Sequence, residues 1–102
     1  MNTLIRTHEF DAWLKGVKDV TARLRILNRI MAAQEGNFGD CEPVGHGISE
    51  MRIFVGPGYR VYYTKRAEVV YLLLCGGNKS SQKRDIKLAK SILDEIEKGD
   101  VE

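Results

Sequence analysis

Residues 48–75 read ISEMRIFVGPGYRVYYTKRAEVVYLLLC, and this stretch decides the fold. Apolar and polar residues alternate from Ile48 to Val55, which is the period of a β-strand with one buried face. Gly56-Pro57-Gly58 predicts a tight turn, and residues 59–65 predict the returning strand. The near-continuous apolar run within residues 68–75 predicts a strand buried on both faces. Together they predict a three-stranded antiparallel meander.

The segments before the meander predict one strand and two helices. TLIRT at residues 3–7 is rich in β-branched and apolar residues, which favours a short opening strand. Residues 8–16 carry apolar side chains at helical spacing. A second helix begins after Asp19, a good N-cap residue, and runs to about Gln34. The apolar stripe predicted to face the core from this helix consists of Val20, Leu24, Leu27, Ile30 and Met31.

Turn-forming residues and one more helix complete the predicted order. Residues 36–47 predict a surface loop with room for a short strand, and Gly76-Gly77-Asn78 predicts a turn that leads the chain out of the sheet. A last helix is predicted over about residues 81–98. The order is thus β-α-α-β-β-β-α in a single domain of residues 1–102. We expect an α+β fold, with the helices packed on one face of the antiparallel sheet.

Composition predicts an ordinary soluble domain. Hydrophobic residues make up 43% of the 102 residues, and no apolar run approaches the roughly 20 residues that span a bilayer. The N-terminus has no charged-then-apolar signal layout. The two cysteines, Cys41 and Cys75, lie far apart in sequence, and without an export signal we expect both thiols to be reduced. These features predict a cytoplasmic protein that does not bind membranes.

Basic residues are concentrated in the middle of the chain. Residues 51–90 contain nine Lys or Arg against two Asp or Glu, although the net charge of the whole chain is only +2. Strand alternation directs Arg52, Arg60 and Tyr62 to the face away from the predicted core. Lys79 follows the third strand, where a helix N-terminus favours phosphate. An anionic partner is predicted, and the alternative is that the arginines merely solvate an exposed sheet face.

Other polar residues extend this surface, while the signals for metals and nucleotides are weak. Two histidines and two cysteines, none at ligand spacing, predict no metal site and no cofactor. The glycine pairs predict turns and not a nucleotide-binding loop. The residues predicted to contact phosphate groups of the partner around the basic face are Lys65, Arg66, Gln82, Lys83 and Arg84.

Two motifs, GPGYRVYY at 56–63 and GGNKSSQKRDI at 76–86, carry a resemblance to a known family. With EGNFGDCEPVG at 35–45 and the upstream FDAWL and ARLRILNRI, they resemble the addiction-module killer proteins of the HigB-like branch of the RelE/ParE toxin superfamily. The resemblance covers almost the whole chain. It implies a RelE-like fold and a toxin of a type II toxin–antitoxin module, neutralised by a cognate helix-turn-helix antitoxin. For HigB-like members it also implies endoribonuclease activity on mRNA at the ribosome, which inhibits translation.

The resemblance also implies site residues. It assigns Arg60, Arg52 and Lys79 to the basic positions of the family. The general acid and base stay open, because the C-terminal histidine–tyrosine pair of HigB-like relatives is absent. Glu50 and His46 are less favoured bases, since an ion pair of Glu50 with Arg52 and an exposed loop histidine are the plainer interpretations.

The implied reaction is a metal-free attack of the RNA 2′-hydroxyl on the adjacent phosphate. Arg60 and Arg52 suit the phosphate because planar guanidinium groups bind oxyanions through two donors. Lys79 adds charge or donates a proton, and Tyr62 stacks on a base or transfers a proton. Two other functions stay open, a ParE-like gyrase inhibitor and a non-catalytic remnant that binds only antitoxin or RNA.

Overall fold

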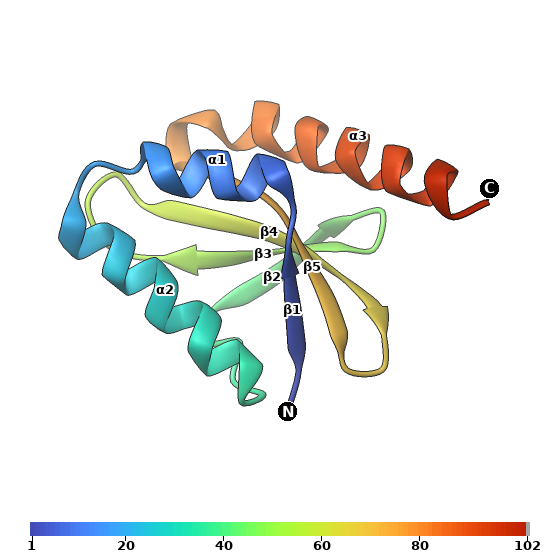
Figure 1. Cartoon of the computed structure of the whole chain (residues 1–102). Helices are drawn as coiled ribbons and strands as arrows, with labels where there is room; N and C mark the ends of the chain where they lie inside the picture. Colours follow the sequence, from blue (N-terminus) through green and yellow to red (C-terminus); the bar gives the residue numbers. More distant parts are fainter. Residues whose placement is uncertain (102) are drawn as a thin grey trace.

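A five-stranded mixed sheet forms the centre of the molecule in the computed structural model, which describes the backbone of residues 1–101 and the side chains of residues 1–99. The strand order across the sheet is β1-β5-β4-β3-β2 (Figure 1). β1 runs parallel to β5, whereas the other neighbouring pairs are antiparallel. The strands are β1 (Thr3–Arg6), β2 (Cys41–Gly45), β3 (Ile48–Ile53), β4 (Tyr59–Ala67) and β5 (Val70–Asn78).

The predicted meander is confirmed as β3, β4 and β5, and the α+β class with it. The helices are α1 (His8–Gly16), α2 (Val20–Gln34) and α3 (Gln82–Val101), and a 3-10 turn, η1 (Lys79–Ser81), precedes α3. α1 and α2 begin where predicted because the side chains of Thr7 and Asp19 accept hydrogen bonds from backbone N–H groups of the first turn. None of the helices, over the described residues, has the apolar length that crossing a bilayer requires. The predicted order lacked one strand, β2.

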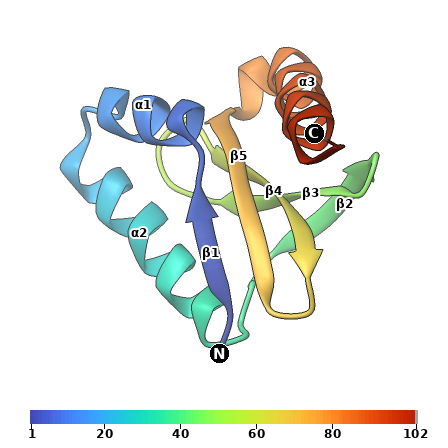
Figure 2. The same ribbon diagram turned by 45° about the vertical axis from the view of Figure 1, so that its right-hand side comes forward.

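Helices cover both faces of the sheet, which corrects the predicted one-sided arrangement. α1 and α2 pack on one face, where Phe10 and Ile26 share a core with Val61. α3 packs on the opposite face over Ile48 and Tyr62 (Figure 2). Val61 and Tyr62 belong to different cores because successive residues of a strand point to opposite faces. The sheet face expected to be free for an anion therefore lies largely beneath α3.

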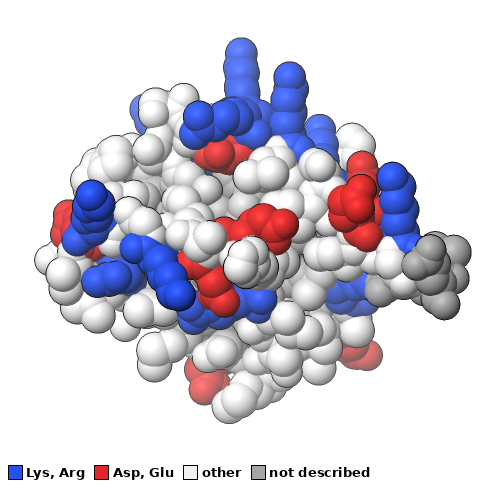
Figure 3. Space-filling model, turned by 45° about the horizontal axis from the view of Figure 1, so that its top comes forward, with Lys and Arg blue, Asp and Glu red and all other residues white. Residues whose placement is uncertain are grey.

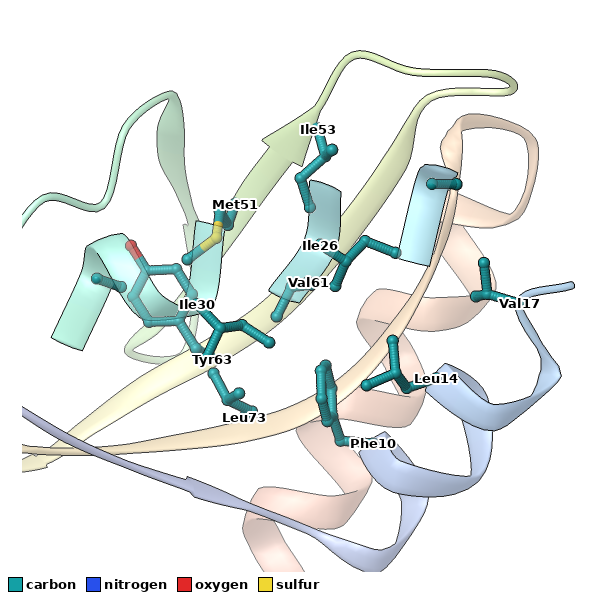
Figure 4. Packing of buried hydrophobic residues seen from close by; sticks show 12 residues of the cluster. Phe10, Leu14, Val17, Ile26, Ile30, Met51, Ile53, Val61, Tyr63 and Leu73 are labelled. Atoms are coloured by element: carbon teal, nitrogen blue, oxygen red, sulfur yellow. The ribbon is translucent and has the colours of Figure 1, made fainter. Parts of the chain in front are cut away.

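α2 buries a different face from the predicted one. Ile26 and Ile30 insert among the strand side chains of the core (Figure 4). Two alanines on the same face leave room for the helix to lie close to the sheet. Leu24 and Met31, predicted to face the core, are more than half exposed. The buried set is Ala22, Ile26, Ile30 and Ala33. Of the predicted stripe, Ile30 is buried and Leu27 packs partly buried against the core, whereas the prediction was wrong at Val20, Leu24 and Met31.

Gly76 and Gly77 continue β5. The prediction that they turn the chain out of the sheet is therefore wrong. A Cβ on Gly76 would lie 2.3 Å from the ring of Trp13 in α1. A Cβ on Gly77 would lie 1.7 Å from Oδ2 of Asp85 in α3. The two glycines are therefore needed because α1 and α3 approach β5 closely from opposite faces. Glycine within a strand often marks such a close approach.

The two cysteines are expected to differ in reactivity. Cys75 is only 1% exposed, and burial raises the pKa of its thiol to about 12. Cys41 lies on the edge strand β2 and is half-buried. Since the thiolate is the reactive form, a disulfide reagent such as DTNB at mildly alkaline pH should label one thiol in the folded chain and both after denaturation. Rapid labelling of the folded Cys41→Ser variant would contradict the burial of Cys75.

Candidate functional site

The candidate site centres on a buried ion pair between neighbouring strands. Glu50 in β3 and Arg60 in β4 point to the α3 face, where Arg60 Nε lies 3.2 Å from Glu50 Oε1. The side chains of Glu50 and Arg60 are only 4% and 12% exposed. Gln82, the first residue of α3, donates its side-chain amide to Glu50 Oε1 at 3.0 Å. The start of α3 is thereby tied to the ion pair.

Arg60 keeps hydrogen-bonding capacity in this buried position. Its Nε is close to Glu50 but is not aligned for a hydrogen bond, and it has no other partner. Within the side chains described, no hydrogen-bond acceptor is found for the rest of the guanidinium group either. Because buried polar groups are usually satisfied, the unpartnered Nε of Arg60 is an exception at the edge of this core.

Arg52 lies directly opposite Arg60 in the β3–β4 ladder. Its guanidinium group is already paired with two carboxylates. Its Nη2 donates to Asp40 at 2.8 Å and its Nη1 donates to Glu42 at 2.9 Å. The hydrogen bond to Asp40 is the main reason why the pKa of Arg52 is raised. A phosphate would have to displace these carboxylates. Glu50, expected to pair with Arg52, pairs with Arg60 instead.

The strand face is consequently not basic, which corrects the prediction from strand alternation. Two arginines stand side by side, and like charges in that position repel. Three carboxylates surround them, and two of these, Asp40 and Glu42, come from β2 and the residue before it. Residues 36–47 were predicted to form a loop, so the two acidic residues that β2 and its neighbour bring to Arg52 were not predicted.

Arg29 of α2 holds the segment that carries Asp40. Its guanidinium donates to the backbone carbonyl of Phe38 at 2.9 Å, to that of Asp40 at 3.2 Å, and also to the carbonyl of Arg52. Gly39 has a φ of +64°, and a Cβ there would lie 2.7 Å from the Arg29 guanidinium. No role was predicted for Arg29 from the sequence. Its position off the apolar stripe of the helix is the only sequence feature that sets it apart from the core residues.

A basic pocket of about 560 Å³ lies beside the buried pair at the start of α3. The side chain of Asn78 caps η1 by accepting hydrogen bonds from the backbone of Ser80 and Ser81. The backbone N–H of Lys79 donates to the carbonyl of Gly58 at 2.8 Å, which anchors η1 to the β3–β4 turn. The predicted residues that line the pocket are Lys79, Gln82, Lys83 and Arg84.

The start of α3 is basic, whereas acidic residues are frequent near its other end. The Lys79 and Lys83 side chains are exposed, and Arg84 has only a 3.7 Å contact to Asp85. Figure 3 shows Lys and Arg side chains projecting along the upper edge, on the side where α3 lies, and acidic side chains near the grey C-terminal end. Gln82 belongs to both the pocket and the buried pair, so the two features form one site.

Tyr62 does not line the pocket, although it lies directly opposite Glu50 in the β3–β4 ladder. Its side chain is fully buried in the core beneath α3, and its hydroxyl has no hydrogen-bond partner. Burial raises the pKa of the phenol, and the nearby carboxylates of Glu50 and Asp85 raise it further. Stacking on an RNA base, one of the two roles expected for Tyr62, needs an exposed ring, and this ring is not exposed.

The remaining predicted residues lie away from the pair. Lys65 and Arg66 are five and six residues beyond Arg60, which is roughly 16–20 Å along β4 at about 3.3 Å per residue. The Lys65 ammonium lies 5.9 Å from the ring centre of Tyr71. His46 is exposed in the turn between β2 and β3, with a φ of +58°. Among the described side chains, no three His, Cys, Asp or Glu residues gather as a metal-ligand set.

Sequence comparison identifies a close relative. The chain is 48% identical over 90 residues to an uncharacterized protein of Haemophilus influenzae. The aligned part covers 88% of this chain and 91% of the relative. No protein-family model matches the chain.

Proposed function

This chain belongs to the same family as the Haemophilus influenzae protein, and we propose that it is the toxin of a type II toxin–antitoxin module, a ribosome-dependent mRNA endoribonuclease of the RelE/ParE superfamily. The motifs GPGYRVYY and GGNKSSQKRDI support the proposal. Both lead into the candidate site, since the first carries Arg60 and the second carries Lys79 and Gln82. A cognate helix-turn-helix antitoxin is the proposed partner.

One observation carries the proposal. Arg60 has unused guanidinium donors, touches the buried Glu50 carboxylate, and is connected through Gln82 to a basic pocket. A cation for a phosphate beside a carboxylate able to accept a proton supplies two of the three groups that cleavage by a 2′-hydroxyl uses, and a proton donor for the leaving oxygen is the third.

In the proposed reaction, RNA phosphates lie along Lys83 and Arg84, and Arg60 binds the scissile phosphate. Glu50 accepts the proton of the 2′-hydroxyl while the 2′ oxygen bonds to phosphorus and the bond from phosphorus to the 5′ oxygen breaks. Lys79 donates a proton to the departing 5′ oxygen. The products are a 2′,3′-cyclic phosphate and a 5′-hydroxyl, and proton exchange with water restores both residues. We assign the phosphate to Arg60 and not to Arg52, because Asp40 and Glu42 compete for Arg52.

The pairing of Arg52 with Asp40 and Glu42 also favours a second candidate function, a binding protein that does not cleave RNA. Carboxylates around Arg52 weaken phosphate binding at the strand face. A ParE-like gyrase inhibitor or a non-catalytic remnant needs no base, so Glu50 would then serve only as the counter-charge of Arg60.

Expression of Glu50→Gln and Lys79→Gln variants separates these candidates. Glutamine keeps the size of Glu50 and accepts a hydrogen bond but takes no proton. We expect either substitution to reduce mRNA cleavage in primer extension by about 10²-fold or more. Lys98→Gln, at the exposed far end of α3, is the control with an unchanged cleavage pattern. Cleavage by Glu50→Gln at the normal rate would exclude Glu50 as the base, and DNA damage without mRNA cuts would support gyrase as the target.

A further inference from the structure

A second pocket lies outside the candidate site, on the side of the sheet that α1 and α2 cover. Its volume is about 440 Å³, within the range of small-ligand sites. It is built from the end of β1, from α1 and from the first turn of α2, so no short sequence motif marks it. Leu14 adds an apolar contribution, and the polar side chains in its lining are Arg6, His8, Asp11, Lys15 and Arg23.

The charges of this lining are unbalanced. Arg6 Nε pairs with Asp11 Oδ1 at 2.6 Å, and the Arg6 guanidinium lies 5.7 Å from the ring centre of Phe10. Asp11 carries the one carboxylate of the pocket lining, and Arg6 already neutralises it. Lys15 and Arg23 have no ion-pair partner among the described side chains. Two cations without counter-charges therefore border a concave site, where the local potential attracts anions.

We propose that this pocket binds a phosphate group, either in an RNA backbone or in a free nucleotide. Lys15 and Arg23 supply the charge, and the part of the Arg6 guanidinium that does not contact Asp11 supplies further donors. The pocket is on the opposite side of the sheet from Glu50 and Arg60, so the proposal does not rest on RNA cleavage.

The test measures binding of three probes to the full chain. The first is a single-stranded RNA of about 12 nucleotides with 2′-O-methyl groups, which the proposed reaction cannot cleave. The others are guanosine 5′-monophosphate and inorganic phosphate. We expect Lys15→Gln/Arg23→Gln to weaken RNA binding at least about tenfold at low salt. The slope of log K against log salt should fall by about 1.4, or about 0.7 for each lost phosphate contact.

The control is Lys18→Gln/Arg25→Gln, which removes the same charge from exposed positions of the same region outside the pocket. It should change RNA affinity less than twofold. Equal losses in both double variants would overturn the proposal, because only overall charge would matter, and so would unchanged binding in the pocket variant. Binding of the mononucleotide that needs Lys15 and Arg23 would identify a free nucleotide as the ligand. None of the three probes is cleaved in the proposed reaction, so a failure of the proposed cleavage is distinguishable from a failure of this binding.

Discussion

Arg60→Met is expected to lower the free energy of unfolding by about 3–5 kcal/mol, because it leaves a buried carboxylate without its counter-charge. Glu50 is 4% exposed, and only the Gln82 amide would remain to satisfy it. Methionine retains much of the apolar stem of arginine, so the loss reports mainly on charge. Urea denaturation followed by circular dichroism measures it.

Removing both charges should be milder than removing one. In Glu50→Gln/Arg60→Met no charge is left buried, and we expect most of the lost stability to return. Arg52→Met is the matched control, since Arg52 stands directly opposite Arg60 but pairs with more exposed carboxylates. Its effect should be much smaller. If Arg60→Met is no less stable than the double variant, the pair does not hold this part of the fold together.

Gly77→Ala is expected to cost about 3 kcal/mol or more, since overpacking against an immovable group is expensive. The new Cβ would lie 1.7 Å from Asp85 Oδ2 and 2.6 Å from its Cγ. Asp85 is buried and accepts a hydrogen bond from the Ser81 hydroxyl, so it has little freedom to move aside. Thermal and urea unfolding measure the loss.

A rescue variant tests this explanation. Gly77→Ala/Asp85→Ala removes the clashing carboxylate, and we expect it to be less destabilised than the sum of the two single variants. Gly16→Ala is the control, because a Cβ there meets nothing within 4 Å. It should change stability by at most about 1 kcal/mol. Additive effects of Gly77→Ala and Asp85→Ala would show that the strain lies elsewhere.

Local signals predicted the elements well because their physical causes are local. The caps at Thr7 and Asp19 act within one turn of their own helices, and both helices begin as predicted. The alternation in β3 and β4 correctly put Glu50, Arg52 and Arg60 on one face. The charged members of the candidate site were thus predictable, although their pairing was not.

The errors arose where a local signal has two uses. α2 has two helical stripes, and the buried one, with Ala22 and Ala33, is the less hydrophobic. Helical spacing alone does not choose between stripes. A glycine pair serves either a turn or close packing, and only the approach of Trp13 and Asp85 decides which.

The sequence by itself determined the strand meander, the starts of the first two helices and which charged residues share a strand face. Only the tertiary structure decided that α3 covers that face, that β2 brings Asp40 and Glu42 to Arg52, and that Glu50 pairs with Arg60. The two groups of features differ in how far apart in the sequence the interacting residues are. Caps and strand parity act between near neighbours, whereas burial and charge pairing depend on residues brought together from distant parts of the chain.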